Sequence, residues 1–311
     1  MRIAIFGTGG VGGYFGGRLA QAGEEVIFIA RDEHLKAIRQ NGLRVDSILG
    51  DFVISPAQAA DSPAEIGAVD LVLVTVKAWQ VTEAAEAIKP LLGPETVVIP
   101  LENGVDAPDE LAAVLGTEHV LGGLCQISVF KAAPGHIKHV AIQPRIAFGE
   151  MDGRPSERVE RLRQVFERAQ GLTVAIPPDI CAAMWEKFLF IAAISGVGSV
   201  TRQPVGVMRS VPEVRGMLLS AMEEIEMVAT RRKIALPPGV TQKTMTFIDG
   251  MPPATMASMQ RDIIEGRPSE LEAQNGAVVR LAKEMDIQVP THAFIYASLL
   301  PGELKARGKI T

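Results

Sequence analysis

A glycine-rich turn follows directly on the first apolar run of the chain. The run from Arg2 to Phe6 predicts a buried strand, residues 14–22 predict a helix that ends at Gly23, and residues 25–30 predict a second strand. The turn before the helix has the sequence GTGGVG, which fits the pattern GxGxxG. A strand, this turn, a helix and a second strand are the setting in which the pattern binds a dinucleotide, and an ordinary tight turn is the alternative.

The three glycines of the pattern have different physical tasks. Gly7 permits the tight turn, Gly9 lets backbone N–H groups approach a pyrophosphate, and Gly12 lets the helix pack closely on the sheet. Further glycines within the helix predict close packing on a strand or a ligand. The residues predicted to bind the cofactor here are Gly7, Thr8, Gly9, Gly10, Val11 and Gly12.

The end of the second predicted strand indicates which nicotinamide cofactor is used. Folds of this type that bind NAD usually carry Asp or Glu here for the ribose 2′-hydroxyl, whereas Arg suits the 2′-phosphate of NADP. The sequence has Arg31 followed by Asp32. Asp32 blurs the signal, but it also occupies the N-cap position of the next predicted helix. The sequence therefore favours NADPH over NADH, with an exposed loop arginine as the alternative.

Charge and composition exclude several classes of partner. The 311 residues, 47% hydrophobic and 22% charged, predict a globular protein of two domains. The net charge of -5 argues against nucleic acid or an anionic membrane as partner. The most apolar run, residues 188–200, is short and broken by glycine, so no membrane span is expected. Because there are two cysteines and no metal-ligand spacing among five histidines, we predict a cytoplasmic protein without a metal.

Strand signals dominate the first part of the chain. They predict a hairpin over 43–54 and strands over 70–76, 96–100, 120–130, 135–140, 145–148 and 173–176. A helix capped by Ser156 precedes the last of these strands. Ligands of open α/β sheets bind at the carboxyl ends of the strands. The glycine turn, Lys77 and Asn103 are therefore expected to face a cleft between the two domains.

Helical periodicity takes over after Pro177-Pro178. Helices are predicted over 179–194, 211–234, 253–264 and 269–285. Methionine-rich faces at Met217, Met222 and Met227 could serve a homodimer as easily as a core. The predicted fold is an α/β Rossmann-type dinucleotide-binding domain over 1–177, followed by an all-α domain over 178–311.

The candidate catalytic residues lie in the helical half, and each has an ordinary structural alternative. Lys187 lies on an apolar helix face, where it either reaches to the surface or faces a pocket and transfers a proton. Glu270 lies in the first turn of a helix, a position that the helix dipole alone would favour for an acid. Ser258 could be a solvated serine, and Asn103 could simply belong to a turn.

Five short motifs together resemble the ketopantoate reductases (2-dehydropantoate 2-reductases) over the full chain. The motifs are Gly7–Gly12, Val76-Lys77-Ala78-Trp79-Gln80, Glu102-Asn103-Gly104, Trp185-Glu186-Lys187 and Ser258-Met259-Gln260-Arg261-Asp262. The resemblance implies NADPH-dependent reduction of a 2-oxo acid, most simply 2-dehydropantoate to pantoate in pantothenate biosynthesis. It also implies an all-helical second domain.

The resemblance further implies roles for residues that match the family's motifs. Lys187 would be the general acid, and Glu270 would contact the reacting hydroxyl. Asn103 would help to hold cofactor and substrate, and Ser258 would bind the substrate carboxylate. The residues that match contacts to the cofactor's 2′-phosphate region are Arg31 and Lys77.

Four positions depart from the family pattern. Asparagines usual four and eight residues after the catalytic lysine are Ile191 and Ser195 here, and two later ones are Val205 and Thr255. Ser195 is nevertheless predicted to bind substrate. Lost amides should change which substrate is preferred, because polar groups in a site can discriminate by about 10⁴-fold. The alternatives are therefore a reductase of a more apolar 2-oxo acid, or a non-catalytic regulator that binds NADPH.

Overall fold

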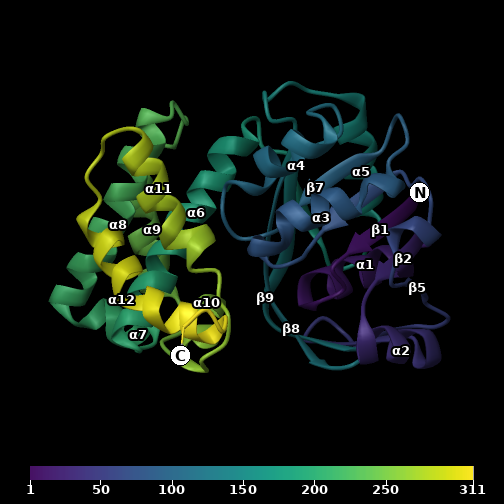
Figure 1. Cartoon of the computed structure of the whole chain (residues 1–311), viewed down its shortest axis with the longest axis horizontal. Coiled ribbons are helices and arrows are strands. Elements are labelled where there is room, and N and C mark those ends of the chain that lie inside the picture. The colour runs from purple at the N-terminus through teal and green to yellow at the C-terminus, as the bar shows by residue number, and fades with distance from the viewer. Residues whose placement is uncertain (311) are drawn as a thin grey trace. The chain divides into compact units, whose positions relative to one another are not determined.

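The computed structural model describes residues 1–310, and the chain divides into two compact units (Figure 1). Unit 1 comprises Met1–Glu102 and Asp106–Ile180, and unit 2 comprises Asn103–Val105 and the chain from Cys181 onwards. The two sheets lie in unit 1 and unit 2 is helical, which confirms the predicted fold class. The division falls between Ile180 and Cys181 rather than between Pro177 and Pro178.

The first sheet of unit 1 places the glycine turn near its centre. Its parallel strands follow the order β5-β2-β1-β6-β7. They are β1 (Arg2–Phe6), β2 (Glu25–Ile29), β5 (Gln58–Ala60), β6 (Leu71–Val74) and β7 (Val97–Pro100). β6 and β7 are buried along their whole length, as expected for a parallel sheet covered on both faces. The strand order reverses at β1, so the turn after β1 lies at the switch point where such sheets bind ligands.

The second sheet has the order β10-β9-β3-β4, with β8 paired to β9. Its strands are β3 (Leu43–Ser47), β4 (Phe52–Ile54), β8 (Gly122–Ala133), β9 (His136–Gly149) and β10 (Thr173–Ala175). The predicted hairpin is confirmed, with Leu43 of β3 opposite Ile54 of β4. Of the three strands predicted between 120 and 148, the one over 120–130 is confirmed as β8. The two over 135–140 and 145–148 are parts of one long strand, β9, whose pairing with β8 shifts register between Ala141 and Arg145.

Helix α1 packs between the two sheets. A Cβ at Gly16 would lie 2.7 Å from Ile5 of β1, and a Cβ at Gly13 would lie 2.7 Å from Ile137 of β9. Real Cβ atoms do not come so close, so the helix reaches both sheets only because these positions are glycine. The predicted close packing is therefore confirmed. The helices of unit 1 are α1 (Gly10–Gln21), α2 (Asp32–Asn41), α3 (Val81–Ala87), α4 (Ala107–Leu115) and α5 (Glu157–Glu167).

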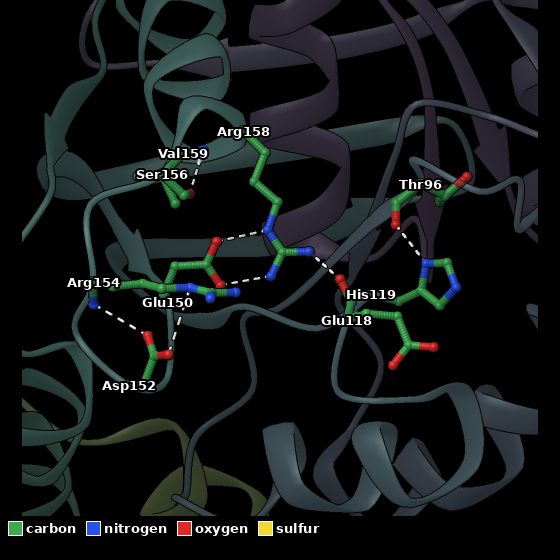
Figure 2. Close-up of polar contacts among 9 residues, drawn as sticks. All are labelled: Thr96, Glu118, His119, Glu150, Asp152, Arg154, Ser156, Arg158 and Val159. Atoms are coloured by element: carbon green, nitrogen blue, oxygen red, sulfur yellow. Dashed lines mark hydrogen bonds and ion pairs between the residues drawn. The ribbon is translucent and has the colours of Figure 1, made fainter.

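An ion pair ties α5 to the end of β9 (Figure 2). Glu150 directly follows β9 and is buried, and Arg158 of α5 donates to both of its carboxylate oxygens, at 2.7 and 2.5 Å. Arg158 also donates to the carbonyl oxygen of Glu118. The hydrogen bonds from Arg158 hold the pKa of the Glu150 carboxyl below its usual value. Ser156 caps α5 by accepting from the N–H of Val159, as predicted.

Unit 2 is built from helices around an apolar core. They are α6 (Ile180–Thr201), α7 (Val205–Ser210), α8 (Pro212–Arg231), α9 (Val240–Gly250), α10 (Ser258–Ile264), α11 (Ala277–Glu284) and α12 (Pro290–Ala306). The sequence did not predict α9, which is rich in threonine, or α12, which contains Pro301. The helix predicted over 269–285 is present from Glu272 onwards, but it begins as a π-helical turn over Glu272–Gly276 that runs directly into α11.

Helix α6 is the core helix of unit 2. It has the length and hydropathy of a membrane span, but 67% of its most apolar window is buried within the protein, as in a core helix. The glycines expected to break this apolar run lie inside the helix. A Cβ at Gly196 would lie 2.5 Å from the Asn275 side chain, and one at Gly198 would lie 2.7 Å from that of Gln260. The glycines thus make room for two buried amides.

Candidate functional site

The turn between β1 and α1 accepts only glycine at its first and last positions. Gly7 has a φ of +103°, and a Cβ there would lie 2.9 Å from the backbone of Thr75. A Cβ at Gly12 would lie 2.4 Å from Oγ1 of Thr75 and 2.5 Å from the carbonyl oxygen of Gly7. The Thr75 hydroxyl donates to that carbonyl at 2.7 Å, which ties the end of β6 to the turn. The chain therefore bends sharply into α1 and keeps the helix on the sheet.

The start of α1 offers unpaired backbone donors. Its first intrahelical bond runs from the N–H of Gly13 to the carbonyl of Gly9, at 2.9 Å. The N–H groups of Gly10, Val11 and Gly12 therefore have no acceptor within the helix. No atom lies within 4 Å of the position that a Cβ would take at Gly9. With the positive end of the helix dipole, these donors fit the pyrophosphate of a dinucleotide.

Thr8 has a different place in the turn from its glycine neighbours. Its N–H and its hydroxyl both donate to the carbonyl of Ile29, at 3.1 and 2.9 Å. The buried His34 contacts the carbonyl of Thr8 through Nε2 at 2.6 Å, while its Nδ1 accepts from the N–H of Gly135. Thr8 was predicted to bind the cofactor, but it has no donor left for a phosphate. It holds the turn on β2.

Alanine at Gly9 and at Gly12 is expected to affect different properties. Gly12→Ala forces a methyl group into Thr75 and the Gly7 carbonyl, so the free energy of unfolding should fall by about 1–3 kcal/mol. Gly9→Ala meets no protein atom, so stability should change by less than about 0.5 kcal/mol. The alanine methyl group of Gly9→Ala would instead obstruct the approach of a phosphate to the free N–H groups of α1, and dinucleotide binding should weaken. Thermal unfolding and NADPH titration of both variants check this. A Gly9→Ala protein with wild-type NADPH affinity would contradict the phosphate site.

Two cationic side chains follow the strands on either side of β1. Arg31 comes after β2 and Lys77 after β6, so both lie at the carboxyl edge of the first sheet, and both are exposed. Arg31 lines an open hollow of about 480 Å³ whose other lining residues are Asp32, Asp61, Ser62 and Glu65. The hollow therefore combines one guanidinium that could bind a phosphate with three carboxylates that would oppose it.

The N-cap predicted at Asp32 is wrong. Arg31 holds the N-cap position of α2 with an extended backbone, and its side chain caps no N–H group. Asp32 is the first helical residue and has a φ of +53°. Aspartate visits this left-handed conformation more readily than most residues. Asp32 thus adopts the left-handed backbone conformation at the start of α2, and the side chain of Arg31 does not cap the helix.

Two of the predicted site residues, Asn103 and Glu270, are in direct contact. Nδ2 of Asn103 donates to Oε2 of Glu270 at 3.0 Å, although the residues are 167 positions apart. Both belong to unit 2, and Glu270 is buried. Gly104 has a φ of +123°, and a Cβ there would lie 3.1 Å from the carbonyl oxygen of Ala273. This tight turn brings Asn103 against the segment that carries Glu270.

The residue before Glu270 is anchored to α12. The N–H of Ser269 donates to both carboxylate oxygens of Glu303, at 3.0 and 3.1 Å, and its hydroxyl donates to Oε2 at 2.5 Å. Arg307 donates to Glu303 at 2.6 Å and to the carbonyl of Ser269 at 2.8 Å. Ser269 and Glu303 are both buried. These bonds fix the backbone from which the Glu270 side chain projects.

The other predicted site residues of unit 2 have side chains without partners. Lys187 is half-buried in α6, and its ammonium makes no hydrogen bond or ion pair with residues 1–310. The half-buried Ser258 begins α10, and its hydroxyl likewise has no partner in the described chain. Ser195 is fully buried with an unpaired hydroxyl. The structure brings none of these three into hydrogen-bond contact with Asn103 or Glu270.

Two of the positions that depart from the family pattern are backbone neighbours. Val205 is fully buried in the core of unit 2, and its N–H donates to the carbonyl of Thr255 at 3.0 Å. A side chain packed in this way cannot line an open pocket. Ile191, in contrast, is only half-buried. Of the apolar replacements, Ile191 is therefore the one that can contact a ligand.

Sequence reasoning missed three residues that hold Glu270. Ser269 and Glu303 anchor its backbone, and Gln274 places Nε2 at 3.4 Å from its Oε2. Gln274 follows Glu270 by four positions, a spacing at which helical side chains meet, so this signal was present in the sequence. The pairing of Ser269 with Glu303 had no such local signal.

Comparison with known proteins gives consistent matches over the chain. Residues 3–153 match the family model for ketopantoate reductase PanE/ApbA, and residues 179–302 match the model for its C-terminal part. The 2-dehydropantoate 2-reductase of Mesorhizobium japonicum is 31% identical over 94% of each chain. An uncharacterized oxidoreductase of Bacillus subtilis, YkpB, is 30% identical over 96% of this chain and 98% of its own. A PanE/ApbA family ketopantoate reductase from Ralstonia eutropha superimposes with a TM-score of 0.90 at 31% identity, covering 99% of this chain and 100% of that one.

Proposed function

Because this chain belongs to the ketopantoate reductase family, we propose that it reduces a 2-oxo acid to the corresponding 2-hydroxy acid with NADPH. The family consists of oxidoreductases that act on CH–OH groups, and ketopantoate reductases use NADPH. The observation that carries the proposal is the hydrogen bond between Asn103 and Glu270. The resemblance gives both residues roles at the reacting centre. The first substrate to test is 2-dehydropantoate, with pantoate as the product.

The proposed mechanism divides the work among side chains of unit 2. When bound, the reduced nicotinamide supplies the hydride that the carbonyl carbon receives. Lys187 donates a proton to the carbonyl oxygen, and its positive charge stabilises the alkoxide as it develops. Glu270, held by Asn103, accepts a hydrogen bond from the new hydroxyl. Ser258 donates to the substrate carboxylate. Hydride and proton together convert the C=O group into CH–OH.

Ile191 favours a second candidate, a reductase of a more apolar 2-oxo acid. It follows Lys187 by four positions on α6, so both side chains lie on one helix face, and it is half-buried. An apolar side chain there would contact the substrate where the family usually has an amide. Steady-state NADPH oxidation with 2-dehydropantoate and with 2-oxo acids of increasing apolar side chain separates the two candidates. Absence of turnover with every acid would leave a non-catalytic NADPH-binding protein.

Arg31→Ala is expected to raise the KM for NADPH about tenfold and to leave the KM for NADH unchanged, because only the phosphorylated cofactor has a 2′-phosphate for the guanidinium to bind. Initial rates with the two cofactors at saturating 2-oxo acid give both constants. The matched control is Glu83→Ala. Glu83 lies 4.0 Å from Arg31, and both side chains are largely exposed, so their ion pair contributes little. Equal rises in the two KM values for Arg31→Ala would show that Arg31 does not read the 2′-phosphate.

A further inference from the structure

Gln274 is a buried residue of unit 2 with half of its amide unpaired. Its side chain is fully buried, and Oε1 accepts no hydrogen bond from the described residues 1–310. Burying an unpaired amide oxygen destabilises a protein relative to an apolar side chain of the same size. A methionine could fill the same volume without that penalty. The buried amide of Gln274 therefore indicates a role other than filling space in the core.

The backbone around Gln274 directs its amide toward Glu270. The N–H of Gln274 donates to the carbonyl of Glu270 at 3.0 Å, so the two residues are one helical turn apart. The helix then widens into the π-helical turn over Glu272–Gly276, in which the N–H of Gly276 donates to the carbonyl of Leu271 at 2.9 Å. π-helical turns are rare in proteins, and those that do occur are often found at functional sites. Local geometry thus places both side chains on one face.

We propose that Gln274 is a positioning residue for Glu270 in the reduction of the 2-oxo acid. Oε2 of Glu270 accepts from Asn103 at 3.0 Å and lies 3.4 Å from Nε2 of Gln274. Two amides on one oxygen hold the carboxylate in a single orientation. Oε1 of Glu270 keeps no partner within the described chain, and it is the atom left to accept from the substrate hydroxyl. This assignment rests on the proposed function, because it gives Gln274 a task in the same reaction.

The first test measures the interaction between the two side chains without using activity. The variants are Gln274→Met, Glu270→Met and the double variant, in a Trp79→Phe background. Trp185, buried in unit 2 against Phe188, then reports thermal unfolding of that unit. Gln274→Met should lower Tm more, or raise it less, when Glu270 is present than when Met replaces it, because only then does the substitution remove a hydrogen bond to the carboxylate. Equal Tm shifts in the two backgrounds would overturn the proposal.

The second test separates positioning from mere packing. Gln274→Met should lower kcat at least about tenfold, as expected for a misplaced catalytic group, while KM for the 2-oxo acid stays within about twofold. Gln274 does not touch the substrate in this proposal, so binding should be spared. A purely structural residue would not produce this split between kcat and KM. A wild-type kcat in Gln274→Met would overturn the assignment.

Gln260→Met is the matched control for both tests. Gln260 is also fully buried with an unpaired Oε1, but its Nε2 donates to the carbonyls of Gly198 and Gln203, at 3.0 and 2.9 Å. Its Tm shift should be the same with and without Glu270, and kcat should stay at the wild-type value. If the wild-type protein reduces no 2-oxo acid, the proposed function fails, and the Tm comparison still decides whether Gln274 holds Glu270.

Discussion

Replacing Lys187 with alanine is expected to lower kcat/KM for the 2-oxo acid by about 10²- to 10⁴-fold, the range that a positioned general acid contributes. The variant loses the proton donor for the carbonyl oxygen and also the charge that stabilises the developing alkoxide. The Lys187 ammonium has no hydrogen-bond or ion-pair partner among residues 1–310, so the substitution removes no polar interaction from the fold. Steady-state NADPH oxidation gives kcat/KM, and thermal unfolding shows whether stability is kept.

Two further variants identify what the lysine supplies. Lys187→Arg keeps the positive charge but is a poor proton donor, because the guanidinium does not deprotonate in proteins. It should therefore recover only part of the lost activity. Lys243→Ala removes an exposed lysine from α9 of the same unit and should change nothing. A loss of less than about tenfold in Lys187→Ala, or about 1.4 kcal/mol of transition-state stabilisation, would refute the assignment of Lys187 as general acid.

The strands and helices of unit 1 could be predicted where the local spacing of apolar residues matches the order of elements in the fold. β1, the glycine turn and α1 follow each other without a gap, and the spacing of apolar residues distinguishes strand from helix. β9 was harder, because its pairing with β8 shifts register between Ala141 and Arg145, and this shift interrupts the alternation in the same way as a strand end. In the second sheet β3 pairs with β9. These strands are far apart in the chain, so local sequence patterns could not predict that they pair.

The sequence could predict which residues belong to the candidate site, but not which of them contact each other or which are buried. Asn103 follows a strand of the first sheet, yet it groups with the helical unit because the turn at Gly104 packs against Ala273. Val205 stands where the family usually has an asparagine, yet its side chain is buried in the core of unit 2. Burial is decided by tertiary packing, so a single sequence cannot tell a buried amide such as Gln274 from a solvated one.

His292 is expected to make unit 2 lose stability in mild acid. The side chain has no exposed surface, and burial lowers its pKa to about 4 from the ordinary value of 6.5. Nε2 lies 3.0 Å from the carbonyl of Ala221, and Nδ1 lies 3.0 Å from the amide of Asn275. Its backbone N–H donates to Glu224, which also accepts from the N–H of Thr291. The imidazole is therefore held neutral at a junction of α8, α12 and the π-helical turn.

The sign of the pH effect follows from which state binds the proton. Between pH 6.5 and about 4, His292 is protonated in the unfolded chain and neutral in the folded protein, so stability is complete above this range and falls as the pH falls through it. The free energy of unfolding should drop by about 2 kcal/mol between pH 7 and pH 5, and by about 3 kcal/mol in total.

Urea unfolding followed by Trp185 fluorescence in the Trp79→Phe background measures the loss, and His292→Asn is the comparison. The buried carboxyls Glu24 and Glu150 have lowered pKa values, so they act only below about pH 4.5 and leave the range from 5 to 7 undisturbed. Burial also lowers the pKa of His34, which therefore contributes in both proteins. The difference in slope between wild type and His292→Asn thus isolates His292. Parallel curves would mean that the imidazole reaches water or a proton acceptor before the unit unfolds.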